Sequence, residues 1–135
     1  MRVIGIDGGA SKVAGAVVTK IDSKTFKIDG EVIEEYYNDQ KGYNYNFQPS
    51  DIQMQKNKSP LSADEIQQGK VYVNTIISII EKLMTKDSTL ISIGMPGIKT
   101  NNNRGIDIMA NGPRIPKLHQ KISDHFGKSI KIMNL

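Results

Sequence analysis

The chain has 135 residues and no cysteine, and its hydrophobic and charged fractions are 38% and 24%. This composition is typical of one soluble globular domain with its own core. No run approaches the roughly 18 apolar residues that span a bilayer, and disulfides and thiolate metal sites are excluded within the chain. The net charge of +4 comes from lysines interleaved with acidic residues, which indicates a solvated surface and not a nucleic-acid-binding patch. We therefore expect a cytoplasmic protein that binds neither membrane nor nucleic acid.

The first motif, IGIDGGASK at residues 4–12, is an apolar run that ends in an aspartate and a glycine-rich turn. Residues 3–6 are predicted as a buried strand and residues 13–18 as the next strand. Small residues at 8–10 let backbone N–H groups approach a shared anion such as phosphate. An ordinary hairpin with a Gly-Gly turn explains the same residues, so the rest of the chain must distinguish the two interpretations.

A third strand is expected over residues 25–37, after the turn-like triplet at 22–24. The first three strands are therefore predicted to pair as an antiparallel meander.

Residues 38–61 turn polar and are predicted as a long loop. Its aromatic side chains, Tyr43, Tyr45 and Phe47, have two interpretations. They stack on a sugar face, or they fold back over an exposed apolar edge, which is the commoner behaviour of aromatic residues in a polar loop.

A helix is predicted over residues 63–85. Ser62 and Glu65 match a capping box, in which each side chain satisfies a free backbone N–H at the helix start. Apolar residues recur at three- and four-residue steps from Ile66 to Met84, which gives one stripe for burial.

The second half of the chain is expected to add strands to the same sheet. Residues 90–93 form a short strand that ends in the turn GMPG at 94–97, where Pro-Gly favours a turn. Further predictions are a strand at 105–110, a helix at 116–126 that begins with a proline, and a strand at 130–133. The sheet is expected to hold about five or six strands.

Two glycine-bearing turns after apolar strands, in a meander followed by strand–helix units, resemble the N-terminal lobe of sugar kinases of the ROK family. The motifs that carry the resemblance are IGIDGGASK at 4–12, GMPG at 94–97, ANGPRIP at 110–116 and IKIMN at 130–134. The family has the actin-like ATPase superfold. The resemblance thus implies an α/β, ribonuclease-H-like lobe with a mixed sheet, whose first three strands are antiparallel, and helices packed on it. Its first motif is closer to the DGGGT of the N-acetylglucosamine kinase branch than to the DIGGT common in the family, which includes the glucokinases.

The resemblance places the phosphates of ATP at the first motif, with Asp7 near Mg²⁺. The residues that it assigns to phosphate binding are Asp7, Gly8, Gly9, Ala10, Ser11 and Lys12. An exposed charge at the start of a strand explains Lys12 equally well.

The resemblance places the sugar at the second turn and the end of the chain. Gly97 would let the backbone approach the sugar, Asn134 would hydrogen-bond a hydroxyl, and Asn111 would support the site, since sugars are read by amides placed to satisfy their hydroxyls. A turn-forming asparagine beside Gly112 is the better explanation of Asn111.

The chain departs from the family at its end. Family members continue from the asparagine into an aspartate that acts as general base, and this chain has Leu135 there. The adenosine-binding motifs and the second lobe are also missing. We therefore expect residues 1–135 to be the N-terminal lobe of a two-lobe kinase, without the C-terminal lobe and inactive alone. The sugar is left open, and so is the formation of a homodimer.

The implied activity of the whole protein is transfer of the γ-phosphate of ATP to a hexose or N-acetylhexosamine hydroxyl, with ATP and Mg²⁺ as cofactors. A sugar-sensing regulator of the same family, without catalysis, is a second hypothesis, although such repressors usually carry a DNA-binding domain before the first strand. Another actin-like ATPase or an acyl-CoA dehydratase activator is a third, which Pro96-Gly97 disfavours.

Overall fold

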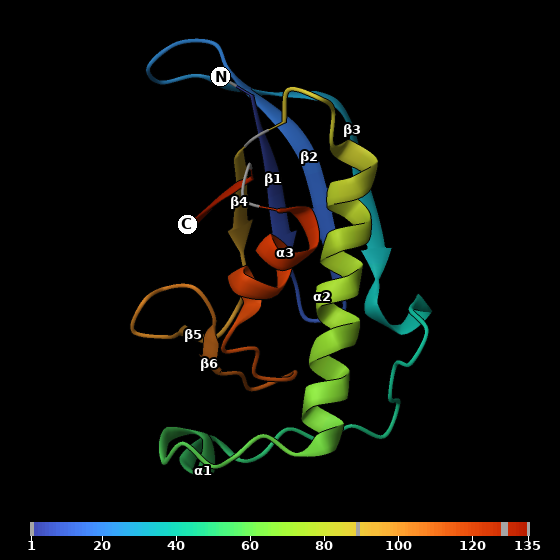
Figure 1. Ribbon diagram of the computed structural model, residues 1–135, viewed down its shortest axis with the longest axis vertical. Helices are drawn as coiled ribbons and strands as arrows, with labels where there is room; N and C mark the ends of the chain where they lie inside the picture. The colour runs from blue at the N-terminus through green and yellow to red at the C-terminus, as the bar shows by residue number, and fades with distance from the viewer. Residues whose placement is uncertain (1, 89, 128–129, 135) are drawn as a thin grey trace.

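The computed structural model describes residues 2–88, 90–127 and 130–134. A main sheet, two longer helices and a small second sheet make up the fold (Figure 1). The elements are, in chain order, β1 (Arg2–Gly8), β2 (Lys12–Lys20), β3 (Phe26–Tyr36), the 3₁₀ turn η1 (Tyr37–Asp39), α1 (Ile52–Lys56), α2 (Ala63–Leu83), β4 (Leu90–Gly94), β5 (Ile98–Lys99), β6 (Ile106–Ile108), α3 (Leu118–Phe126) and β7 (Lys131–Asn134).

The main sheet is mixed and has five strands in the order β3-β2-β1-β4-β7. β1 pairs antiparallel with β2, and β2 pairs antiparallel with β3. β4 joins β1 in parallel, and β7 joins β4 in parallel. The predicted meander of three strands is confirmed, and so is a mixed sheet with helices packed on it.

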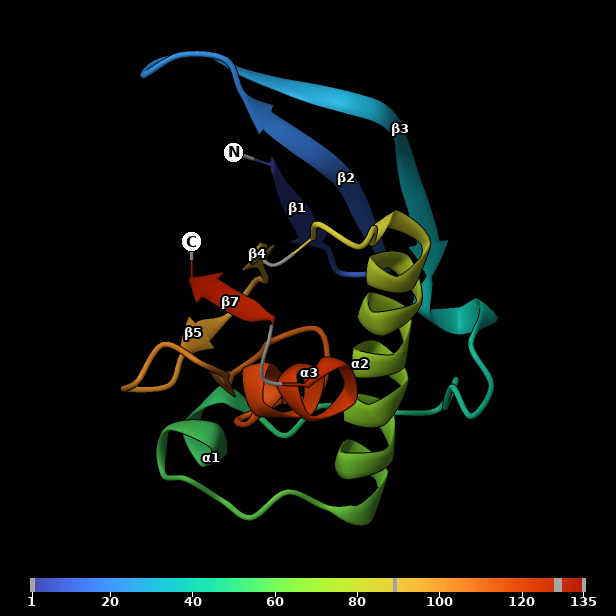
Figure 2. The ribbon, with the colours of Figure 1, turned by 45° about the horizontal axis from the view of Figure 1, so that its top comes forward.

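The two longer helices, α2 and α3, lie on the same face of the main sheet (Figures 1 and 2). Along β1, Ile4 and Ile6 are buried toward these helices, while Val3 and Gly5 belong to the opposite face, as the two-residue period of a strand requires. Ile76 and Ile80 of α2 are fully buried in the same core. The other face of the sheet is left without a covering layer in the described part of the chain.

Helix α2 begins where the capping residue was predicted, because the Ser62 hydroxyl accepts a hydrogen bond of 3.1 Å from the Glu65 N–H. The helix then runs close to β2. A Cβ on Gly15 would lie 2.4 Å from Cγ2 of Ile79, so a glycine is what allows this approach. The predicted apolar stripe is wrong at one end, since Ile66 is 47% exposed.

Two short elements interrupt the predicted loop at 38–61. Tyr37 was predicted as the end of the third strand, but it begins η1 and is buried. Helix α1 is capped by the Asp51 carboxylate, which accepts a hydrogen bond of 2.9 Å from the Met54 N–H. With only five residues, α1 is too short to leave a helical period in the sequence.

The predicted strand at 105–110 does not join the main sheet. Only Ile106–Ile108 is extended, as β6, and it pairs with β5 in a separate two-stranded sheet. The Ile106 N–H also donates to the Ile115 carbonyl at 2.9 Å, an isolated bridge that keeps residue 115 out of the helix. Helix α3 therefore begins at Leu118 and not at Pro116.

Within the described residues, no helix is both long enough and apolar enough to cross a membrane.

Candidate functional site

The carboxyl ends of three parallel strands meet at one edge of the main sheet. Asp7 of β1 lies opposite Gly94 of β4, and Ile93 of β4 lies opposite Asn134 of β7. Ligands of open α/β sheets bind outside the carboxyl ends of the strands. The structure thus brings the two glycine-bearing turns, 8–11 and 94–97, together with the backbone of Asn134.

The two turns touch each other at Gly8. A Cβ on this residue would lie 1.9 Å from Sδ of Met95 and 3.3 Å from the Gly94 carbonyl oxygen. Turn 8–11 is closed by a hydrogen bond of 2.8 Å from the Gly9 N–H to the Lys12 carbonyl. The glycine at position 8 therefore lets the Met95 side chain and the Gly94 backbone lie against the first motif, a role that the sequence did not indicate.

Two buried tyrosines, from elements distant in the sequence, hydrogen-bond to the backbone of turn 8–11 from the core side. The Tyr37 hydroxyl of η1 donates to the Gly9 carbonyl at 3.2 Å, and the Tyr72 hydroxyl of α2 donates to the Ala10 carbonyl at 3.5 Å. Their rings stack with centroids 3.6 Å apart and planes 5° from parallel.

Both tyrosines remain hydroxyl donors at neutral pH. Burial, followed by the neighbouring Tyr72 and Asp7, raises the pKa of Tyr37, and burial together with Tyr43 raises the pKa of Tyr72 to about 12. Sequence reasoning missed both residues as part of the site. A tyrosine at a strand end and another on an apolar helical stripe look like ordinary core residues.

The charged side chains of the first motif have different surroundings. Asp7 is exposed at the end of β1. Lys12 pairs with Glu34 of β3 at 3.1 Å and lies 5.8 Å above the Tyr36 ring, and its hydrogen bond with Glu34 raises the pKa of Lys12. Ser11 is exposed. The pairing of Lys12 with Glu34 agrees with the alternative interpretation, in which Lys12 is an exposed charge at the start of a strand.

Turn 94–97 is held by its own backbone geometry and by Lys99. Gly97 has φ +93°, and a Cβ there would lie 2.4 Å from the Ile108 carbonyl oxygen. The Lys99 ammonium donates to the carbonyls of Met95, Pro96 and Gly97, and burial lowers the pKa of Lys99. Position 97 therefore requires a glycine because its backbone passes close to β6 of this same chain.

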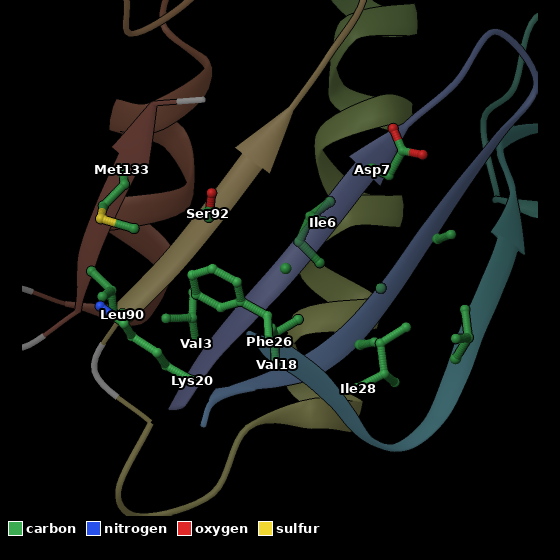
Figure 3. Close-up of a pocket in the computed structure, with 15 residues that line it drawn as sticks. Val3, Ile6, Asp7, Val18, Lys20, Phe26, Ile28, Leu90, Ser92 and Met133 are labelled. Atoms are coloured by element: carbon green, nitrogen blue, oxygen red, sulfur yellow. The ribbon is translucent and has the colours of Figure 1, made fainter. Parts of the chain in front are cut away.

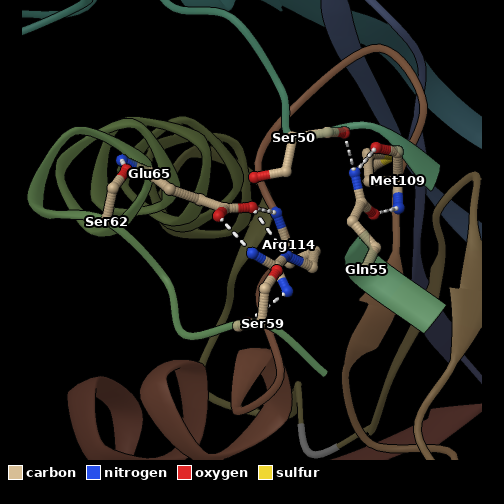
Figure 4. Close-up of polar contacts among 7 residues, drawn as sticks. All are labelled: Ser50, Gln55, Ser59, Ser62, Glu65, Met109 and Arg114. Carbon is tan, nitrogen blue, oxygen red and sulfur yellow. Dashed lines mark hydrogen bonds and ion pairs between the residues drawn. The ribbon is translucent and has the colours of Figure 1, made fainter. Parts of the chain in front are cut away.

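The segment that carries Asn111 is anchored by a buried polar network (Figure 4). Arg114 forms two side-chain hydrogen bonds with Glu65, of 2.9 and 2.7 Å, and a third of 2.8 Å with the Ser59 carbonyl. Gln55 of α1 bonds both the N–H and the carbonyl of Met109, at 2.7 and 3.0 Å. Asn111 itself is exposed within a bend beside Gly112, as a turn-forming asparagine would be.

Asn134 ends β7, and its backbone pairs with Ile93. Leu135, at the position expected for a general base, lies outside the described residues.

The aromatic side chains of the long loop divide between the two interpretations. Tyr43 packs against the core and forms an edge-to-face pair with Tyr45, with ring centroids 5.0 Å apart. Tyr45 is 76% exposed, and its hydroxyl donates to the Asn38 carbonyl at 3.1 Å. Tyr43 therefore folds back against the core, whereas stacking of an aromatic side chain of this loop on a sugar stays a prediction.

A hollow of about 690 Å³ lies on the face of the sheet that the helices leave open, with Asp7 at one end (Figure 3). Apart from Asp7, Lys20 and Ser92, the residues around it are glycines or have apolar side chains, as do Val3, Val18, Phe26 and Ile28. Such a lining suits apolar side chains and not a phosphate or a sugar. No group of three or more His, Asp or Glu side chains that could hold a metal occurs in the described ranges.

Comparison with known proteins supports the fold. The chain resembles a crystal structure from Cytophaga hutchinsonii ATCC 33406 described as a "putative sugar kinase", with a TM-score of 0.58 and 13% sequence identity. The match covers 99% of this chain but 35% of the other, so this chain spans about a third of that protein's length. No protein-family model and no curated protein sequence matches. The chain therefore has a fold like one part of a sugar-kinase-like structure.

Proposed function

We propose that the chain is the N-terminal lobe of an ATP-dependent sugar kinase of the ROK type, with a ribonuclease-H-like core. The observation that carries the proposal is the contact between the Asp-Gly-Gly motif, whose Gly8 is the last residue of β1, and the GMPG motif, whose Gly94 is the last residue of β4, at the carboxyl edge of the sheet. The fold similarity to a sugar-kinase-like structure supports it. A kinase needs its phosphate-binding and acceptor-binding groups side by side, and this edge provides neighbouring positions for both.

The nucleotide side is formed by Asp7 and turn 8–11. Mg²⁺ keeps several of its waters and is usually held by one or two carboxylates together with the substrate phosphates. The single exposed carboxylate of Asp7, beside a turn of small residues, is compatible with this type of Mg²⁺ coordination. When bound, Mg²⁺ would neutralise charge on the phosphates, while Asp7 orients it and the backbone N–H groups of the turn bind the phosphate oxygens.

The acceptor side is formed by turn 94–97 and the end of β7. Asn134 and Asn111 would hydrogen-bond and support a hexose or N-acetylhexosamine. A further part of the protein would supply the adenosine pocket and the base that takes the hydroxyl proton. The whole enzyme would be cytoplasmic.

The proposal is tested by titrating the ¹⁵N-labelled chain with Mg·ATP and then with hexoses and N-acetylhexosamines. We expect the amide signals of residues 7–12 to shift with Mg·ATP, with a dissociation constant of about 1 mM or weaker, and those around 94–97 to shift with a sugar. Absence of both shifts would contradict the proposal.

A variant pair separates the metal contact from general charge effects. Asp7→Asn should weaken binding of Mg·ATP but not of ATP in the presence of a chelator. Asp29→Asn removes an exposed carboxylate that pairs with Arg2 on the same sheet and should leave both affinities unchanged. Equal behaviour of the two variants would contradict a metal-orienting role for Asp7.

A further inference from the structure

We propose that Tyr37 and Tyr72 are positioning residues of the phosphate site, which hold turn 8–11 so that the N–H groups of Ala10 and Ser11 point outward to an anion. This inference rests on the function proposed above. It adds two residues from η1 and α2, neither of which belongs to the glycine-rich motif.

The direction of the N–H groups follows from the geometry of a trans peptide. In such a peptide the carbonyl of one residue and the N–H of the next point in opposite directions, and the described residues contain no cis peptide. The Gly9 carbonyl points to the Tyr37 hydroxyl, so the N–H of Ala10 points away from it. The Ala10 carbonyl points to the Tyr72 hydroxyl, so the N–H of Ser11 also points away.

A third bond extends the same pattern by one residue. The Tyr37 N–H donates to the Ser11 carbonyl at 3.1 Å. Three successive carbonyls, those of Gly9, Ala10 and Ser11, are therefore held from the protein side by two tyrosines. Successive N–H groups that face one way form a concave anion-binding site.

The two outward N–H groups are free to bind a ligand. Throughout the described part of the chain, no group accepts a hydrogen bond from the N–H of Ala10 or of Ser11, whereas the Gly9 N–H is used inside the turn. Ala10 and Ser11 are both exposed, so an anion can reach these groups.

The tyrosines themselves are fixed. Tyr37 and Tyr72 are 1% and 4% exposed, and their rings stack on each other within the core below the turn. Their high pKa values keep the hydroxyl protons in place at neutral pH. A hydroxyl on a rigid ring can therefore set the orientation of a turn of small residues, which has little intrinsic preference of its own.

The test removes the hydroxyls and leaves the rings. Tyr37→Phe, Tyr72→Phe and the double variant are titrated with Mg²⁺ and inorganic triphosphate, and the amide signals of Ala10 and Ser11 are followed. We expect the double variant to bind triphosphate about three- to tenfold more weakly, with smaller shifts of these two signals, because the turn loses both hydroxyl donors that orient its N–H groups.

Tyr45→Phe is the matched control. It also removes one bond from a hydroxyl to a carbonyl, that of Asn38, but it does so on a ring that is 76% exposed and pairs with Tyr43. It should leave triphosphate binding unchanged. Thermal unfolding shows whether each variant is folded, and if the double variant is not, the single Tyr72→Phe variant, which removes the longer bond, replaces it.

The outcomes separate this inference from the proposed function. If the unaltered chain shows no shift at Ala10 and Ser11 with triphosphate, the phosphate site itself is wrong, and the inference is overturned with it. If the unaltered chain binds and the folded phenylalanine variants bind equally well with equal shifts, only the positioning role is overturned.

Discussion

Glu65 and Arg114 form a buried ion pair in which each side chain is 3% exposed. One Glu65 oxygen also accepts a hydrogen bond of 2.9 Å from the Arg114 backbone N–H. The hydrogen bond with Glu65 raises the pKa of Arg114. A buried carboxylate is stable only when it is paired and hydrogen-bonded, and here one residue supplies both the charge and two kinds of N–H donor.

Arg114→Met is predicted to destabilise the protein by about 3–5 kcal/mol, because it leaves the Glu65 carboxylate buried without its counter-charge. Arg2→Met is the control. It breaks an ion pair with Asp29 whose side chains are 54% and 53% exposed, and exposed pairs contribute about 0–1 kcal/mol. Urea unfolding of both variants measures the difference. Equal losses would contradict a special role for the buried pair.

Glu65 also shows how much the sequence could predict at the scale of single residues. The capping box predicted the helix start correctly through Ser62, but it also predicted that Glu65 would bond back to the Ser62 N–H. Instead, Glu65 binds Arg114, a residue 49 positions later. A local motif reports the bonds available within one turn, and it cannot reveal a stronger charged partner that only the fold brings near.

At the scale of elements, Gly69 is the weak point of α2. A Cβ there would lie 3.6 Å from Cγ1 of Ile115, an ordinary contact distance, and glycine in a helix interior costs about 1 kcal/mol relative to alanine. Gly69→Ala is therefore predicted to stabilise the protein by about 0.5–1 kcal/mol, measured as a higher urea midpoint. A lower midpoint would mean that Ile115 cannot accept the methyl group.

Gly105→Ala provides the contrast, because a Cβ there would lie 1.8 Å from the Pro116 carbonyl oxygen. Backbone cannot move aside as a flexible side chain can, so this variant should lose about 1–3 kcal/mol or more.

Elements with a clear period were predictable, and those held by tertiary bonds were not. The strands of the meander and helix α2 follow from apolar periodicity and from turn residues. Helix α1 and the pairing of β5 with β6 do not, because α1 is fixed by the bonds of Gln55 to Met109, and β6 is fixed partly by Ile115. The candidate site divides similarly. The glycine turns could be read from the sequence, whereas Tyr37 and Tyr72 could not, since their role depends on which loop lies above them.

At the scale of the whole molecule, the fold is asymmetric, with helices on one face of the main sheet and an apolar hollow on the other (Figures 2 and 3). Contiguous exposed apolar patches bind hydrophobic probes. Ile28→Ser is predicted to lower the fluorescence of bound anilinonaphthalene sulfonate, because Ile28 lines the hollow and is 52% exposed. Ile98→Ser, which alters a side chain that is 57% exposed on β5, should not. Equal fluorescence from both variants would show that the dye binds elsewhere.

The last prediction concerns catalysis by this chain. The edge that carries turns 8–11 and 94–97 belongs to one sheet, and the chain matches 35% of the sugar-kinase-like structure. Phosphoryl transfer depends on positioning both substrates and excluding water, and loss of a general base alone costs about 10²- to 10⁴-fold in rate. We therefore expect no sugar-dependent ADP release from the 135-residue chain in a coupled assay with hexoses and N-acetylhexosamines, even where Mg·ATP binding is detected. Sugar-dependent turnover would contradict the proposal that the chain is a single lobe, because it would require that these residues alone enclose both substrates and supply the base.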